Sequence, residues 1–248
     1  MPPEAGTATL LHWSAWTPAP QTLPSQEAGF ESPPVEFVPM LLRRRMSRLS
    51  RMVVYVAERC CREADVSPDS VRVVFASYHG ELLSTVGILA QIKREESVSP
   101  TDFTMSVHHS PVSILSLLTG NQKAGRAVAG GEESFCCGFL DSLGMLLKGE
   151  DPVLFLAGDD CVPLPFSKFV RQPLFPCAVA LLLKKEVIPG KLRLSLSLDA
   201  HPEPGNRVGP ISEIFPPLDF IKWLSTKESQ WSLSSEKRRW TWTRHPQA

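Results

Sequence analysis

The residues best placed to do chemistry lie at a glycine turn near the middle of the chain. An apolar pair, Val128-Ala129, enters Gly130-Gly131, and an apolar segment over residues 135–148 follows. Glycine suits a turn that needs a positive φ or close backbone packing. A helix that begins here directs its free N–H groups and its positive dipole end toward an anion such as a thiolate. The residue that this turn presents is Glu132, which is a carboxylate instead of a thiol.

Two thiols follow within the same apolar segment. Cys136 and Cys137 lie between two phenylalanines, about one helical turn after Glu132. A thiol buried among apolar neighbours has a raised pKa and is inert, so we expect both cysteines to belong to the core. Glu132 and Glu133 are expected to stabilise a helix start by about 0.5–1 kcal/mol. A catalytic role for Glu132, such as assisting the decarboxylation of a malonyl group, stays open.

Histidines and paired carboxylates are the remaining reactive groups. His108 and His109 would point to opposite faces of a strand, so they are not expected to share a metal ion. We interpret each of them, like His79, as a core or turn histidine. Asp159-Asp160 follow an apolar run, and carboxylates at the end of a parallel strand often face a site, although they are also ordinary loop residues. The pattern predicts neither a metal nor a cofactor.

Composition narrows the class of protein. The chain has 248 residues, of which 43% are hydrophobic, so it can bury a sizeable core. Lys+Arg and Asp+Glu are equal at 26 each, which argues against a dedicated nucleic-acid binder. Residues 1–20 lack the features of a secretory signal, and no apolar run reaches the roughly 18 residues that span a bilayer. The six cysteines have no zinc-like CxxC spacing, so reduced thiols in a cytoplasmic protein are expected.

Strand-like and helix-like segments alternate along the chain, which predicts an α/β domain with a largely parallel sheet and buried helices. The expected strands cover residues 7–16, 71–76, 126–129, 153–157, 177–183 and 192–198, the last of them half exposed. The expected helices cover residues 40–64, 81–94, 111–118, 135–148 and 218–224. Residues 17–38 and 97–100 are expected to be loops. We divide the chain into a domain over residues 1–200 and a Pro-rich extension with a polar, ragged tail over residues 201–248.

Two basic segments have a plain interpretation and a functional one. Residues 237–244 mix basic and aromatic side chains, a combination that can bind nucleic acid or a membrane surface. One short run of this kind on a neutral protein is weak evidence for either ligand. We therefore expect a flexible tail or one that packs on a partner. Arg43, Arg44 and Arg45 could attract an acidic carrier protein, but we interpret them first as a solvated helix start.

Taken together, several of these segments resemble the β-ketoacyl synthase family, the condensing enzymes of the thiolase-like fold. The similar segments are the Arg-Met helix at 43–52, the strand and turn at 71–81, the stretch at 99–109, the buried helix at 114–120 and the strand at 126–131. Counted from Gly120, Glu132 occupies the position at which an active synthase carries its cysteine nucleophile. The resemblance covers roughly residues 8–200. It is greatest to short β-ketoacyl synthase-like, N-terminal domain proteins found beside polyketide-type or aryl-polyene-type biosynthesis systems.

The resemblance implies the N-terminal half of a thiolase-like enzyme, without the nucleophile. The family's further catalytic residues, two histidines or His and Asn, lie in a second half for which this chain has no room. The implied function is a non-catalytic accessory protein of fatty-acid or polyketide-type synthesis that pairs with a ketosynthase, an acyl-carrier protein or a second copy of itself. The family's two-fold pairing would use the strand at 126–129, an edge that needs covering. Two alternatives stay open: a minimal enzyme acting on acyl thioesters through Glu132 or a nearby Cys, and an interaction module unrelated to lipid synthesis.

Overall fold

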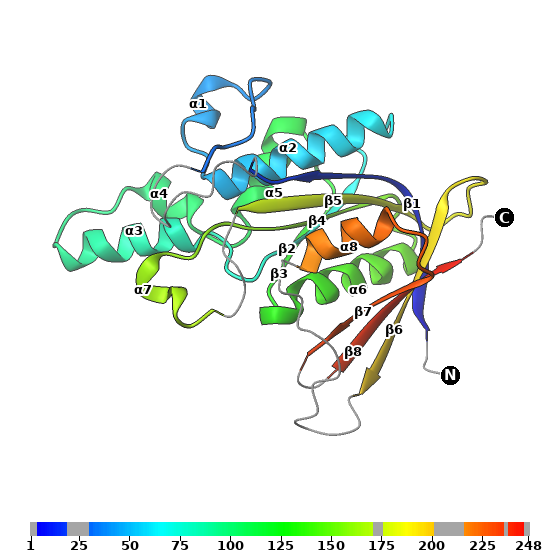
Figure 1. The fold of residues 1–248 in the computed structure, drawn as a ribbon. Coiled ribbons are helices and arrows are strands. Elements are labelled where there is room, and N and C mark those ends of the chain that lie inside the picture. Colours follow the sequence, from blue (N-terminus) through cyan, green and yellow to red (C-terminus); the bar gives the residue numbers. More distant parts are fainter. Residues whose placement is uncertain (1–3, 19–29, 171–175, 201–215, 236–237, 246–248) are drawn as a thin grey trace.

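One continuous mixed sheet organises the chain. The computed structural model describes residues 4–18, 30–170, 176–200, 216–235 and 238–245, and its strand order is β3-β2-β4-β5-β1-β6-β8-β7 (Figure 1). The strands are β1 (Glu4–Trp16), β2 (Arg72–Ala76), β3 (Gly125–Val128), β4 (Val153–Asp159), β5 (Cys177–Lys184), β6 (Leu192–Ala200), β7 (Gln230–Ser234) and β8 (Arg238–His245). All six strands expected from the sequence are present, and β7 and β8 are additional.

Parallel pairing is confined to one end of the sheet. β2 pairs in parallel with β3 on one side and with β4 on the other. The pairings β4–β5, β5–β1, β1–β6, β6–β8 and β8–β7 are antiparallel. The sheet is therefore less parallel than the alternation of elements suggests. The three parallel strands all point their carboxyl ends at the same edge, which is where ligands bind in open α/β sheets.

Helices α2 (Arg48–Glu63) and α5 (Ser110–Thr119) cover one face of this sheet. The sequence predicts one helix over residues 40–64, but the structure breaks it into α1 (Met40–Arg43) and α2. The break is at Ser47, whose hydroxyl accepts a hydrogen bond from Ser50 N at 2.9 Å and so caps α2. Arg43, Arg44 and Arg45 consequently lie in and just after a separate short helix.

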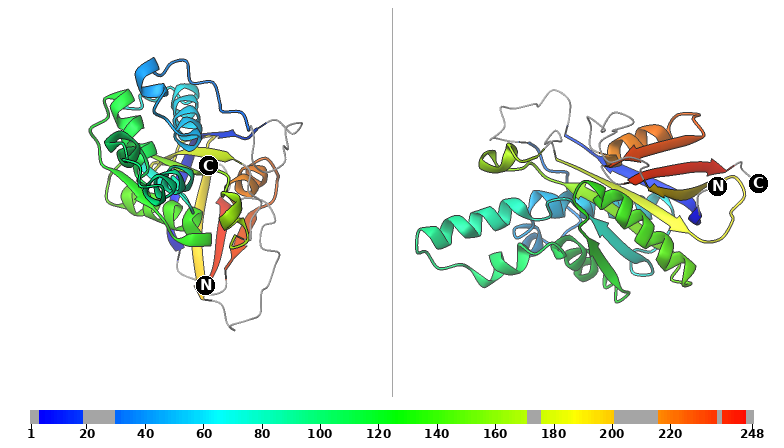
Figure 2. Two further views of the ribbon diagram at one scale, coloured as in Figure 1. Left: turned by 90° about the vertical axis from the view of Figure 1, so that its left-hand side faces the viewer. Right: turned by 90° about the horizontal axis from the view of Figure 1, so that it is seen from below.

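The opposite face carries α6 (Ser134–Leu147) and α8 (Pro216–Leu224), over which the far strands curl (Figures 1 and 2). Phe135 of α6 lies 5.4 Å from Phe155 of β4, 5.3 Å from Phe220 of α8 and 5.8 Å from Trp242 of β8, measured between ring centroids. Trp242 is fully buried. The expectation of a polar, ragged end is therefore wrong for residues 230–235 and 238–245, because alternate aromatic side chains of β8 cover α6. The helix expected at 218–224 is confirmed.

Two helices project from the body of the molecule. α3 (Leu82–Lys93) and α4 (Pro100–Met105) pack against each other, and we call residues 82–105 the arm (Figures 1 and 2). No residue of either helix is buried. The remaining short elements are a 3-10 turn at Gly131–Glu133 and α7 (Leu164–Ser167). None of the helices in the described parts of the chain combines the length and apolar character needed to cross a membrane.

Candidate functional site

A small pocket lies at the carboxyl ends of the parallel strands. Ser77 and Tyr78 come directly after β2, Asp159 ends β4, and Glu132 belongs to the turn that follows β3. Pro217 of α8 closes another side. The cavity volume is about 20 Å³, which is room for about one water molecule.

The glycine turn before α6 forms as the sequence predicts. Gly131 has φ +61°, a conformation that L side chains rarely adopt. A Cβ on Gly130 would lie 3.0 Å from Cys137 Sγ, so this position also requires close backbone approach. The Ser134 hydroxyl accepts a hydrogen bond from Gly130 N at 3.0 Å and donates one to Gly131 O at 2.7 Å. The turn is thus held by Ser134, by glycine and by the backbone hydrogen bond from Glu133 N to Gly130 O at 3.2 Å.

The two glutamates of the turn have different environments. The Glu133 carboxylate accepts hydrogen bonds from Trp240 Nε1 at 3.1 Å and from the Ser235 hydroxyl, and it lies 3.5 Å from an Arg238 guanidinium nitrogen. It therefore fastens the β7–β8 hairpin to the start of α6. The Glu132 carboxylate lines the pocket and makes no hydrogen bond or ion pair within the described part of the chain. Glu132 is the glutamate that is available to a ligand or a partner.

Asp159 is the buried acid of the pocket. Its Oδ1 accepts hydrogen bonds from the Ser77 hydroxyl at 2.6 Å and from His79 N at 2.8 Å, and its Oδ2 accepts one from Tyr78 N at 3.0 Å. Burial raises the pKa of Asp159 to about 6, against the effect of these donors. Its main structural effect is to hold the loop after β2 against the end of β4.

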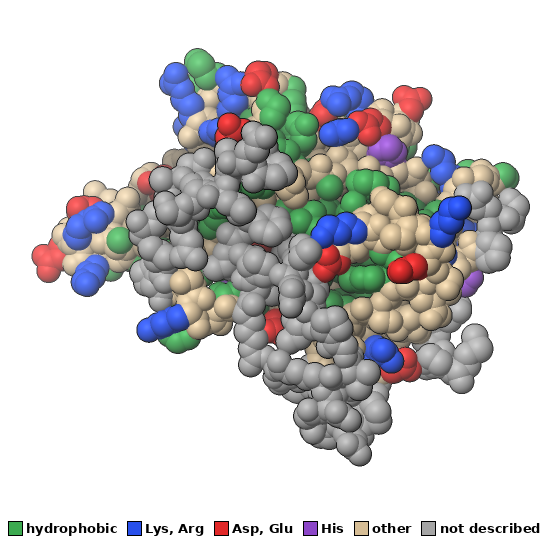
Figure 3. Space-filling view, viewed as in Figure 1, with side chains coloured by type: hydrophobic (Ala, Val, Ile, Leu, Met, Phe, Trp, Pro, Cys, Tyr) green, Lys and Arg blue, Asp and Glu red, His purple; other side chains and the backbone are tan. Residues whose placement is uncertain are grey.

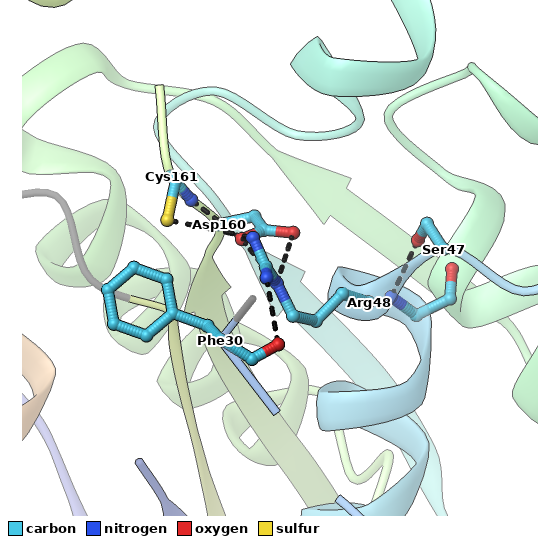
Figure 4. A network of polar contacts seen from close by, with 6 residues as sticks. Phe30, Ser47, Arg48, Asp160 and Cys161 are labelled. Carbon is cyan, nitrogen blue, oxygen red and sulfur yellow. Dashed lines mark hydrogen bonds and ion pairs between the residues drawn. The ribbon is translucent and has the colours of Figure 1, made fainter. Parts of the chain in front are cut away.

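Asp160 points the other way, toward the start of α2. Arg48 Nη2 lies 2.6 Å from Asp160 Oδ1, and Arg48 Nε lies 3.1 Å from Oδ2 (Figure 4). The same guanidinium donates to Phe30 O at 3.2 Å. Cys161 N donates to Asp160 Oδ1 at 2.7 Å. The structure therefore separates the two adjacent aspartates: Asp159 lines the pocket, and Asp160 forms an ion pair that joins β4 to α2.

The cysteines near the turn are poor nucleophiles. Cys136 is fully buried, and desolvation raises its pKa well above the ordinary value. Cys137 is half-buried below Gly130, and desolvation and the nearby Glu133 raise its pKa. All six cysteines are free thiols. The core placement expected from the sequence is confirmed for Cys136 and holds in part for Cys137.

The histidines pack inside the fold near the pocket without forming a cluster. His108 packs against Gly80, and a ring nitrogen lies 3.3 Å from Val128 O. His109 is the N-cap residue of α5, and His79 stacks on Tyr78 with ring centroids 4.0 Å apart. Burial lowers the pKa of His79 and His108, which favours the neutral rings. Within the described ranges, no group of three or more His, Cys, Asp or Glu side chains is placed to hold a metal ion.

The sequence identified part of this site. It marked Glu132 and Asp159, which the structure brings to one pocket, and it separated them correctly from the core cysteine Cys136. It missed Ser77 and the hairpin partners of Glu133, since nothing in the chain indicates that residues 230–245 fold back over α6. A signal for Ser77 was present, because a polar residue directly after a buried strand lies at the same sheet edge as Asp159.

A glycine turn that leads from a parallel strand into a buried helix, with helices on both faces of the sheet, agrees with the resemblance to the thiolase-like class of condensing-enzyme folds. The chain matches the family model for the β-ketoacyl synthase, N-terminal domain, over residues 13–243. It belongs to that family.

Solved structures of this class are similar over most of the chain. A chain of the complex between the ketosynthase ApeO and its chain length factor ApeC from Xenorhabdus doucetiae is 27% identical, with a TM-score of 0.77; the match covers 96% of this chain and 99% of that one. The ishigamide ketosynthase/chain length factor is 14% identical, with a TM-score of 0.64, covering 79% of this chain and 67% of that one. The AntDE:AntF complex, a type II polyketide synthase acyl-carrier protein with its ketosynthase, is 13% identical, with a TM-score of 0.61, covering 80% and 70%. The last two show the fold alone. A search of curated protein sequences gives no match.

Proposed function

We propose that this chain is a non-catalytic β-ketoacyl synthase-like accessory protein of fatty-acid or polyketide-type, including aryl-polyene-type, biosynthesis. The observation that carries the proposal is Glu132 at the turn before α6, where the family resemblance expects the acyl-accepting cysteine. A carboxylate cannot hold the acyl chain as a thioester in the usual way. Cys136 and Cys137 do not replace the missing thiolate, because their pKa values are raised.

The size of the pocket supports the same conclusion. A cavity of about 20 Å³ beside Glu132 has no space for an acyl chain. The far side of α6 is filled by side chains of this same chain, including Phe220 and Trp242. We therefore propose that the extended substrate lies in the partner, and that this chain shapes the complex from outside the reaction centre.

The arm and the adjacent sheet edge support pairing with a ketosynthase. Leu89 and Ile92 of α3 are each 56% exposed, and Phe103 of α4 is 63% exposed. Exposed apolar side chains on a projecting helix pair favour an interaction site there. Among the described strands, β3 pairs only with β2, so its other edge is available for backbone hydrogen bonds to a partner. Pairing with a second copy is the competing outcome for the same surface.

A separate surface over α1 suits an acyl-carrier protein. Arg43, Arg44 and Arg45 make no side-chain ion pair with any described carboxylate. Leu41 beside them is 72% exposed, and Met40 is 54% exposed. Figure 3 shows basic and hydrophobic side chains next to each other over this part of the molecule. A helix with acidic residues flanking an apolar stripe would complement this surface. Reduced cysteines agree with our proposal of a cytoplasmic setting.

The test is co-purification of the chain with the ketosynthase and the carrier protein of its own biosynthetic system. We expect a stable complex with the ketosynthase, abolished by Leu89→Glu or Ile92→Glu on the arm. Val187→Glu is the matched control, because Val187 is 49% exposed in the turn between β5 and β6, remote from the arm. Indifference of the wild-type chain to both proteins, or equal loss of binding in the control, would contradict the proposal. A homodimer alone would favour self-pairing or an unrelated interaction role.

The alternative function is that of a minimal enzyme acting on acyl thioesters. The observation in its favour is that Glu132 lines the pocket with a carboxylate free of partners in the described residues. The test is turnover of malonyl and acyl thioesters by the purified chain, compared with Glu132→Gln and Cys137→Ala. Turnover that depends on either residue would establish the enzyme. Complete inactivity of the wild-type chain, alone and with the ketosynthase, would eliminate it.

A further inference from the structure

Among the described residues, α3 contributes no buried apolar side chain to the core of the molecule. Its apolar side chains are exposed or half-exposed, and α3 packs on α4. The arm meets the body at its two ends: residues 77–81 before α3, and Met105 to His109 after α4. Segments with few buried apolar contacts open at low free-energy cost. The orientation of the arm therefore depends on the contacts made at these ends.

One buried side chain dominates the first of these ends. Glu81 is the N-cap residue of α3 and is 4% exposed. Its carboxylate accepts hydrogen bonds from the hydroxyls of Ser47 at 2.7 Å, Ser50 at 2.8 Å and Ser84 at 3.3 Å. Ser47 is the N-cap residue of α2, Ser50 belongs to the first turn of α2, and Ser84 belongs to the first turn of α3. A single carboxylate thus joins the starts of two helices.

The described part of the chain places no cation against this carboxylate. Glu81 has no ion pair among the residues described, because the nearby Arg48 is bound to Asp160. Desolvation raises the pKa of Glu81. The hydrogen bonds from the three hydroxyls oppose this rise, and the repulsion by Asp160 adds to it. A buried acid that lacks a counter-charge is costly unless its hydrogen bonds compensate it. Glu81 therefore has a strict geometric requirement: it is stable only where all three hydroxyls converge.

We infer that Glu81 is the positioning residue of the arm, fixing α3 relative to α2 and so setting the geometry of the surface that meets a partner. The partner part of this inference rests on the proposed function, whereas the orientation of the arm does not. Glu81→Ala removes the acceptor for all three hydroxyls. Glu81→Gln keeps a carbonyl oxygen for Ser47 and Ser50 and so conserves most of the junction.

The experiment is hydrogen–deuterium exchange of the full chain followed by mass spectrometry. We expect Glu81→Ala to speed the exchange of α3 amides by about tenfold or more, and Glu81→Gln by no more than about threefold, with β4 and β5 unchanged in both. Asn121→Ala is the matched control: Asn121 is 7% exposed and donates to Pro68 O and Val71 O, both at 2.8 Å, at the opposite end of α5. Equal α3 exchange in Glu81→Ala and in the control would overturn the inference.

Two additions keep the test decisive. If Glu81→Ala does not fold, Ser50→Ala removes one of the three donors, and we expect a smaller acceleration confined to the arm; no acceleration there would refute the role of Glu81. Binding to the ketosynthase is then measured for the same variants, and we expect it to weaken for Glu81→Ala but not for Asn121→Ala. Loosening of the arm together with failure of even the wild-type chain to bind would refute the proposed function and leave the positioning role intact.

Discussion

Because α6 packs closely on the sheet, we expect alanine substitution to have opposite effects on stability at two glycines of this helix. A Cβ added at Gly138 would lie 2.7 Å from Ala76 Cβ on β2 and 2.7 Å from Phe155 Cε2 on β4. Apolar carbons prefer about 3.5–4.0 Å, so α6 would have to move outward by about 1 Å. A Cβ added at Gly144 would meet nothing within 4 Å. The two positions share a helix and differ in what faces them.

The magnitudes follow from these distances. Replacing Gly by Ala in a helix gains about 1 kcal/mol of stability, and overpacking a core costs about 1–3 kcal/mol. We expect Gly144→Ala to raise the free energy of unfolding by up to about 1 kcal/mol and Gly138→Ala to lower it by up to about 2 kcal/mol. Urea unfolding followed by tryptophan fluorescence measures both, and each 1 kcal/mol also corresponds to a Tm shift of about 2–4 °C. Equal stabilisation by the two substitutions would refute the seating of α6 on β2 and β4.

Three further predictions concern the glycine turn, the pocket and the thiols. Glu133→Ala should destabilise the fold by about 1–3 kcal/mol, since it leaves a buried indole N–H unpaired, whereas Glu132→Ala should stay within about 0.5 kcal/mol of wild type; thermal unfolding compares them. The pKa of Asp159 is raised from 3.8 to about 6 on folding, so its contribution is fully present below about pH 4 and is lost as the pH rises through 6, which removes up to about 3 kcal/mol. Asp159→Asn should abolish that dependence in unfolding measured from pH 4 to pH 7, and an unchanged pH profile would contradict the burial of this carboxyl. Alkylation of the native protein at pH 8 should modify Cys137 and Cys161 slowly and spare the four fully buried cysteines, with uniform labelling as the contrary result.

Local patterns determined most of the first part of the fold. Apolar runs of strand length gave β2, β4 and β5, because strands buried on both faces carry little else. Glycine at residues 130–131 and the apolar segment after it predicted the turn and α6. Counting positions along the sequence from Gly120 was enough to place Glu132 at that turn. The interpretation that Glu132 replaces the family's cysteine therefore rests on the sequence and not on the coordinates.

The tertiary structure decided which of these residues act together. The segment over residues 40–64 has one unbroken helical pattern, yet the Ser47 cap divides it, since a serine hydroxyl that satisfies a free backbone N–H competes with continued helix. Glu132 and Glu133 are adjacent and of the same residue type, and nothing in the sequence indicates that Trp240, more than 100 residues away, donates its hydrogen bond to Glu133. Sequence periodicity reports which face of a segment is apolar, and it carries no information on which distant segment covers that face. For that reason the chain alone predicted an apolar α6 and the glycine turn before it. The cover of β8 over α6, the lack of a Glu132 partner among the described residues and the junction at Glu81 required the folded structure.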